Sequence, residues 1–326
     1  MPWFVGAVAL AIVLGMAPPA LARERTDAVN PMENAAPSRH TRDALYAALD
    51  QYLAALAARD PTRVRWAERV RNTENNVALM VGDGLWGTIT AIGDYRLKFA
   101  DLEQGQVGYF GTVTEPQETS AFSLRLKVEE GGAISEVETL VVRQLDSGIR
   151  FENQRFWDKP ILNANVPARR RTPRARMLSL ADGYFDTLQL NDGTLFTKFH
   201  PDCQRVENGV QTTNNPEFAT IVPVAALGCE EQFKMGNYRY DDRLRGRRFP
   251  LVDEERGLVL TAGFIDHSGR LADYQLTDGR TVNSPVRRPH RFYLMELFKI
   301  EAGAIRQIEA NFITVPYHMP SPWDAW

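Results

Sequence analysis

The sequence has few of the side chains that build metal and thiol sites. Its 326 residues include two cysteines and five histidines. No histidine or cysteine spacing is typical of a zinc site, so we expect no bound metal. Both cysteines, Cys203 and Cys229, lie in the second half of the chain. In an exported protein such a pair favours a disulfide, and a thiol nucleophile is the alternative.

Long apolar runs and an excess of one charge are also missing. The net charge is −3, which is not typical of nucleic-acid binding. The apolar run at residues 4–17 is shorter than the roughly 20 residues that span a membrane. Ala20-Leu21-Ala22 follows it, as before a signal-peptidase site, although no basic residue precedes the run. We predict a signal peptide at 1–22 and a periplasmic or secreted protein without integral membrane contact; a buried N-terminal helix is the alternative.

Nucleotide and serine-hydrolase motifs are absent as well. The chain has no GxSxG, Walker loop or dinucleotide fingerprint, so we expect no cofactor. A basic run, RRRTPRAR at residues 169–176, holds two turn-prone residues. It favours a solvated linker, with a polyanion contact as the alternative.

What the chain does contain is a repeat. The segment LRLKVEEGGAISEVETLVV at residues 124–142 resembles LMELFKIEAGAIRQIEANFITV at residues 294–315. Two such similar hairpins predict two domains of one fold. The expected order is a flexible arm, the first repeat, a basic linker and the second repeat, at residues 23–40, 41–160, 161–176 and 177–326.

Apolar periodicity and turn residues predict the same element order in both repeats. In the first we expect helices at 43–58, 60–67 and within 79–92, and strands at 69–76, 95–100, 106–114 and 121–142. In the second we expect helices at 178–190, 193–199 and 216–235, a strand at 203–209, a polar insertion at 266–289 and a closing hairpin at 292–315.

This order resembles the nuclear transport factor 2-like fold of ketosteroid isomerase, scytalone dehydratase and the SnoaL-type polyketide cyclases. The resemblance implies an α+β class: two tandem cone-shaped barrels, each a curled antiparallel sheet wrapped on a long helix around an apolar pocket. Four segments are similar to secreted two-repeat proteins of fungi and bacteria without established activity: TENN (73–76), RRFPLVDEERG (247–257), FIDH (264–267) and VPYHMPSPW (315–323).

The resemblance places the general base of the steroid isomerases at Asn75 and Asn208, and an amide cannot accept a proton at neutral pH. Glu74 and Glu207 precede these residues and are expected to face away from the pocket unless a bulge shifts them. Glu138 and Glu309 share strand faces with apolar residues, which favours either burial in the pocket or ion pairs at its rim.

Ionisable residues are concentrated in the second repeat, where strand ends are expected to line a pocket. We predict catalytic roles there for Glu207, Tyr238, Asp253, His267 and His290. Substrate contacts are predicted for Asn208, Arg239, Glu309, Asn311 and, in the first repeat, Glu74. For each, a surface, turn or structural ion-pair role is the alternative.

The predicted function is a cofactor-independent lyase, isomerase or hydratase that acts by acid–base chemistry on a small apolar or aromatic oxygenated compound in the second-repeat pocket. The alternative is a non-catalytic ligand-binding or assembly protein. We expect a small-molecule partner, no nucleic acid, and an intramolecular pseudo-dimer of the repeats with possible homo-oligomers.

Overall fold

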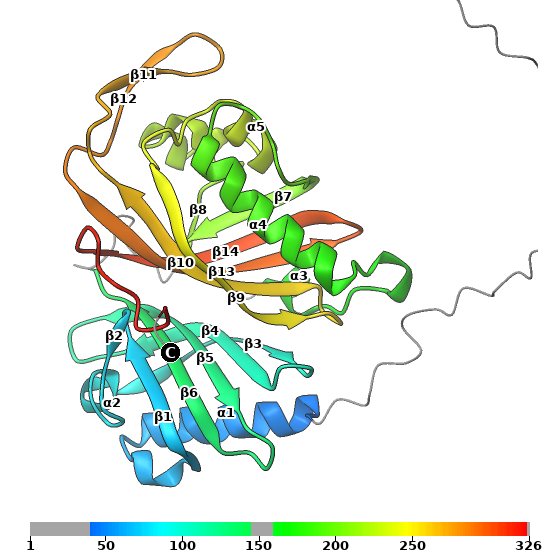
Figure 1. Ribbon diagram of the computed structural model, residues 1–326, viewed down its shortest axis with the longest axis vertical. Helices are drawn as coiled ribbons and strands as arrows, with labels where there is room; N and C mark the ends of the chain where they lie inside the picture. Colours follow the sequence, from blue (N-terminus) through cyan, green and yellow to red (C-terminus); the bar gives the residue numbers. More distant parts are fainter. Residues whose placement is uncertain (1–39, 145–158, 325–326) are drawn as a thin grey trace, which may run out of the picture. The chain divides into compact units, whose positions relative to one another are not determined.

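The computed structural model describes residues 40–144 and 159–324, and these contain two sheets of similar build (Figure 1). The predicted signal peptide and most of the arm lie outside the described residues. The first repeat contains α1 (Arg42–Ala57), a 3-10 turn (Pro61–Arg63), β1 (Trp66–Glu74), β2 (Val77–Ala78), α2 (Leu85–Thr88), β3 (Ala91–Asp101), β4 (Gln106–Thr114), β5 (Thr119–Val128) and β6 (Ile134–Val142).

The second repeat follows the same plan with additions. Its elements are α3 (Pro160–Asn163), η3 (Ala168–Arg170), α4 (Arg174–Leu190), β7 (Phe199–Glu207), β8 (Val210–Gln211), η4 (Phe218–Thr220), η5 (Pro223–Ala226), α5 (Cys229–Lys234), β9 (Arg243–Asp253), β10 (Leu258–His267), β11 (Asp273–Gln275), β12 (Thr281–Asn283), β13 (His290–Glu301) and β14 (Ala304–Val315).

Both six-stranded sheets have equivalent strand orders, β2-β1-β6-β5-β4-β3 and β8-β7-β14-β13-β10-β9. The α+β class is therefore confirmed. The expectation of wholly antiparallel sheets is wrong, because β1 pairs parallel with β6 and β7 pairs parallel with β14. In the described part of the chain each sheet is open, since its outer strands pair on one side only.

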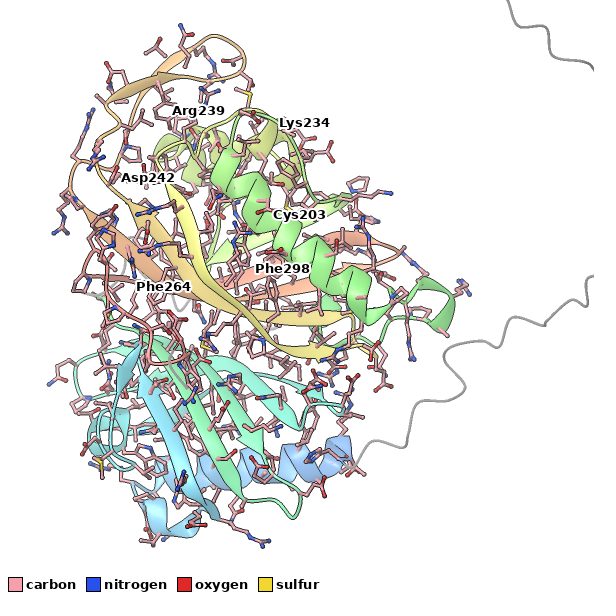
Figure 2. All side chains as sticks on the ribbon, viewed as in Figure 1. Cys203, Lys234, Arg239, Asp242, Phe264 and Phe298 are labelled. Atoms are coloured by element: carbon pink, nitrogen blue, oxygen red, sulfur yellow. A yellow bond between two sulfur atoms is a disulfide. The ribbon has the colours of Figure 1, made fainter. Side chains whose placement is uncertain are left out.

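The helix of each repeat packs on one face of its own sheet. Thr41 caps α1 by accepting a hydrogen bond from the backbone N–H of Ala44, and buried residues at helical spacing, Leu45, Leu49 and Tyr52, face the sheet. In the second repeat Phe298 of β13 lies beneath α4, where its ring contacts Tyr184 and Phe185 (Figure 2). Each repeat thus has its own apolar core.

A third apolar cluster contains side chains from both sheets, including Phe99 and Phe110 of the first and Leu260 and Tyr293 of the second. Buried charges accompany it. Glu138 pairs with Arg125 at 2.9 Å and with Arg248 of the second repeat. These contacts fix the far face of each sheet, so that the face toward the helix is the one left to form a pocket.

Several helical predictions are wrong. Residues 193–199 form bends that lead into β7, and residues 216–235 form the separate short pieces η4, η5 and α5. Pro216 and Pro223 interrupt the apolar periodicity there, because proline removes a helical N–H. The basic run is anchored by ion pairs, since Arg170 contacts Glu301 at 3.1 Å and Arg174 contacts Asp101 at 2.5 Å.

A cavity with two polar ends as the candidate functional site

The second repeat contains a cavity of about 350 Å³ between its sheet, α4 and the segment that precedes β9. Its size lies at the lower end of the range of small-molecule sites, about 300–1,000 Å³. Its lining is Tyr184, Leu188, Arg205, Glu207, Thr212, Phe218, Val222, Tyr238, Tyr240, Asp241, Ile265, Pro285, Val286, His290, Phe292, Leu294, Glu296, Ala310 and Phe312.

Strand β13 runs along this cavity. His290, Phe292, Leu294 and Glu296 all line it, as expected for alternate residues that share one strand face. Along this strand face the two outer residues, His290 and Glu296, are polar, and the two residues between them are apolar. These two outer residues are six residue steps apart along the strand, which corresponds to about 20 Å between the Cα atoms. The cavity is therefore long, with an apolar middle and a polar group at each end.

Two carboxyl groups lie at one end, in a row across three strands. Glu207 of β7 pairs with Ala310 of β14, and Ala310 pairs with Glu296 of β13. Two strand spacings place the Cα atoms of the two glutamates about 10 Å apart. The side chain between them is a single methyl group, so the row leaves space between the two carboxyl groups. We call Glu207, Glu296, Arg205 and Tyr184 the acid end.

The two carboxyl groups have different surroundings. Glu296 is 3% exposed, and burial together with the charge of Glu207 raises the pKa of Glu296 from 4.5 to about 8. Glu207 forms an ion pair with Arg205 at 3.6 Å, and its side chain is 23% exposed. At neutral pH the site thus presents a protonated carboxyl opposite a carboxylate, the pattern expected of a proton donor and acceptor pair.

Arg205 organises the donors of the acid end. Its guanidinium donates to Oε1 of Gln232 at 2.5 Å, to Oγ1 of Thr212 at 3.2 Å and to the hydroxyl of Tyr238. Tyr184 also lines this end of the cavity, where burial and the charge of Glu296 raise the pKa of its hydroxyl against the effect of Arg205.

The opposite end contains imidazoles, and we call Asp241, His267 and His290 the histidine end. Nε2 of His267 lies 2.8 Å from Oδ1 of Asp241, and the two imidazole rings stack with centroids 4.5 Å apart. Burial raises the pKa of Asp241 and lowers the pKa of His290. His290 is therefore neutral at pH 7 and can accept a proton or a hydrogen bond.

The matching position in the first repeat is filled. Glu74 pairs with Thr139, and Thr139 pairs with Leu124, so Leu124 and Thr139 stand where Glu296 and Ala310 do. The remaining space is about 10 Å³ and is lined in part by Trp86. The asymmetry between the repeats follows from these substitutions, because an additional ring and larger side chains occupy the space.

Glu207, Tyr238 and His290, three of the predicted catalytic residues, line the cavity, and His267 contacts Asp241 and His290 at its histidine end. Glu207 lines the cavity, and the bulge that the expectation allowed for is present, since the β7–β14 pairing shifts register between Phe199 and Gln204. The strand ends at Glu207, and Asn208 adopts φ 48° in the turn that follows. Its amide binds the backbone N–H and carbonyl of Phe312 at 2.9 and 3.1 Å, so the aligned base position holds the sheet together.

Other predicted residues lie elsewhere. Asp253 is buried at the β9–β10 turn, paired with Arg42 at 2.6 Å. Glu309 faces the first repeat, where it accepts from Tyr95 at 3.0 Å and contacts Lys159 at 3.1 Å. Asn311 donates to Ser123 at 2.7 Å.

Arg239 is exposed near the segment before β9 (Figure 2). In the first repeat Glu74 lines the small space described above and accepts from the N–H of Leu85 at 2.7 Å. Neither side chain is part of the second-repeat cavity, whose lining comes from other residues.

Sequence reasoning missed four functional candidates, Tyr184, Arg205, Asp241 and Glu296. Two signals were available. Arg205 and Glu207 alternate on one strand, and Glu296 is in phase with Phe292 and Leu294, although the aligned residue of the first repeat is Leu124. Glu296 in the second repeat thus replaces the leucine of the first, and this difference between the closing strands indicates a site that only the second repeat has.

The cysteine prediction is confirmed, since Cys203 of β7 and Cys229 of α5 form a disulfide with Cα atoms 5.8 Å apart. It joins the segment over the cavity to the sheet. Across residues 40–144 and 159–324, no helix combines the length and apolarity needed to cross a membrane. Within the same ranges no three His, Cys, Asp or Glu side chains gather as metal ligands would.

Comparison with known proteins gives a family and no activity. No curated protein matches the chain. The family model described as a domain of unknown function, DUF8021, matches residues 38–141 and 170–312, one segment in each repeat. These segments cover most of the chain and include both sheets, apart from the last strand residues of each, so the protein belongs to the DUF8021 family.

Proposed function

We propose that the second repeat is a cofactor-independent enzyme of lyase, isomerase or hydratase type that acts on a small apolar or aromatic oxygenated compound. The observation that carries this proposal is the acid end, where protonated Glu296 and ionised Glu207 flank the space over Ala310. Buried titratable groups with displaced pKa values are typical of functional sites. The surrounding apolar lining suits an apolar ligand body.

The geometry suits proton transfer next to a carbonyl group. A ligand carbonyl oxygen between Tyr184 and Glu296 would accept the carboxyl proton of Glu296 as a hydrogen bond. The carboxylate of Glu207 would then remove a proton from the adjacent carbon, and the negative charge would move to the oxygen that Glu296 stabilises. Return of the proton to another carbon gives isomerisation, and loss of a β-substituent gives elimination.

The likeness to the nuclear transport factor 2-like fold supports this function by analogy, because isomerases and dehydratases of that fold place their chemistry between a sheet and a helix. Export is also part of the proposal. The Cys203–Cys229 disulfide supports it, since such bonds persist in oxidising compartments.

Deuterium exchange in D₂O tests the proposal without knowledge of the natural substrate. We choose 4-phenylbutan-2-one as the probe and mass spectrometry of its α-carbon positions as the readout. The wild type should accelerate exchange, and Glu207→Gln should lower the enzymatic rate at least 100-fold, since a positioned base contributes roughly 10²–10⁴-fold. Glu296→Gln should reduce exchange while it preserves probe binding, because the amide still donates a hydrogen bond.

The matched control is Glu103→Gln on the surface, whose side chain is 61% exposed, and it should behave as the wild type. Exchange by Glu207→Gln at the wild-type rate would contradict the assigned base. Binding of the probe by the wild type without any exchange would favour the second candidate function, a ligand-binding protein. The ion pair between Glu207 and Arg205 favours that alternative, because the carboxylate already has a partner in the protein.

A further inference from the structure

The histidine end plays no part in the proton transfer proposed above, although it lies in the same cavity. His267 is fully buried, and its Nδ1 has no hydrogen-bond partner among the described residues. His267 itself does not line the cavity, so a ligand meets this end at Asp241 and His290.

The hydrogen bonds of the two imidazoles assign their protons. Nδ1 of His290 lies 3.0 Å from the carbonyl oxygen of Arg288, and a carbonyl can only accept, so Nδ1 carries the proton. Nε2 of His290 is then an acceptor. Nε2 of His267 is already engaged by Oδ1 of Asp241. The histidine end therefore presents an acceptor, Nε2 of His290, whereas Glu296 at the acid end presents a donor.

Between the ends the lining is apolar. Phe292 and Leu294 of β13, Ile265 of β10 and Phe312 of β14 separate the two polar groups. Arg205 is the only lysine or arginine among the described residues that line the cavity, and its guanidinium is already bonded to Gln232, Thr212 and Tyr238. A ligand carboxylate or phosphate would find no available cation there, and burial of an unpaired charge is costly.

We propose that the cavity selects elongated, uncharged compounds that carry a carbonyl group at one end and a hydroxyl group at the other, joined by an apolar body. The carbonyl oxygen accepts from Glu296 and the hydroxyl donates to His290. Phe292 and Leu294 contact the body between them. This inference rests on the proposed function, because it assigns the second end of the same site.

Two matched ligand series test it. One is a set of para-hydroxyphenyl methyl ketones whose spacer grows by one methylene at a time, and the other is the same set without the hydroxyl. Dissociation constants are measured by calorimetry. The hydroxyl should tighten binding about tenfold at one spacer length and less at shorter or longer ones, since one well-made hydrogen bond contributes about 1.4 kcal/mol.

His290→Phe keeps a flat ring and removes the acceptor. It should abolish the gain from the hydroxyl, so that the two series bind alike at each spacer length. Glu296→Leu, which introduces the first-repeat residue, should weaken both series equally. A hydroxyl effect below threefold at every spacer length would overturn the proposal, as would an undiminished effect in His290→Phe. If His290→Phe fails to fold, the length dependence in the wild type decides alone.

The outcome is separable from that of the proposed function. Ketone exchange without a hydroxyl gain would retain the enzyme and remove the selectivity. A length-dependent hydroxyl gain without exchange would retain the two-ended site and remove the acid–base chemistry.

Discussion

Replacement of Glu296 by glutamine should make the protein more stable, by an amount that grows with pH. The folded protein holds this carboxyl at a pKa of about 8, whereas its ordinary value is 4.5. At about 1.4 kcal/mol per pKa unit, the difference corresponds to roughly 5 kcal/mol. Its sign follows from proton binding: between pH 4.5 and 8 the folded state keeps a proton that the unfolded chain releases.

The stability that this group contributes is therefore complete below pH 4.5 and is lost as the pH rises through 8. Glutamine does not titrate, so the free energy of unfolding of Glu296→Gln minus that of the wild type should increase by roughly 5 kcal/mol across this window. Urea unfolding at pH 5, 6, 7 and 8, with the disulfide intact and Glu103→Gln as the control, measures it. A difference that stays constant with pH would refute the burial argument for Glu296.

Three further predictions concern the frame around the site. The charges of Arg248 and Arg125 lower the pKa of Glu138 to about 2, against the effect of burial. Glu138 therefore contributes stability above pH 4.5, and this stability is lost as the pH falls toward 2. Glu138→Gln should cost about 3–5 kcal/mol at pH 7 and flatten the acid-unfolding profile, as urea titrations would show; an unchanged profile would contradict the buried pairing. The Cys203–Cys229 bond closes a loop with a sequence separation of 26, so its reduction should lower the free energy of unfolding by about 3.5 kcal/mol. Reduction should also weaken binding of the probe in calorimetry. Equal affinity after reduction would show that the cavity does not depend on the disulfide. Trp86→Ala in the first repeat should cost about 3–5 kcal/mol in thermal unfolding and leave exchange by the second repeat unchanged, and lost exchange would argue against separate roles for the repeats.

The sequence predicted the parts of the fold that depend on local patterns. The spacing of Leu45, Leu49 and Tyr52 predicted α1, and the repeated hairpins predicted two equivalent units, because periodicity and turn residues act over short distances. The parallel pairings of β1 and β7 depend on contacts between distant segments, which no local pattern contains. Residues 216–235, the segment over the cavity, were predicted to form one helix because apolar residues outnumber proline and glycine in this segment.

For the site, the sequence predicted some of the residues but not their positions in the fold. Glu207 and His290 line the cavity, while Asp253 pairs with Arg42 and Glu309 accepts from Tyr95, so that both join the two repeats. All four are acidic or basic residues of strands, and only the sheet register decides which face each one occupies. Alignment to the family pattern places the base at Asn208, whereas β7 ends at Glu207 and the Asn208 amide is bonded to the backbone of Phe312.

The most direct test of the account is a crystal structure of the protein with 4-phenylbutan-2-one bound. We predict one molecule in the second repeat, with its carbonyl oxygen within hydrogen-bond distance of Glu296 and Tyr184 and its α-carbon facing Glu207. Binding in the first repeat, or a second repeat whose side chains fill the space between Glu207 and Glu296, would contradict it.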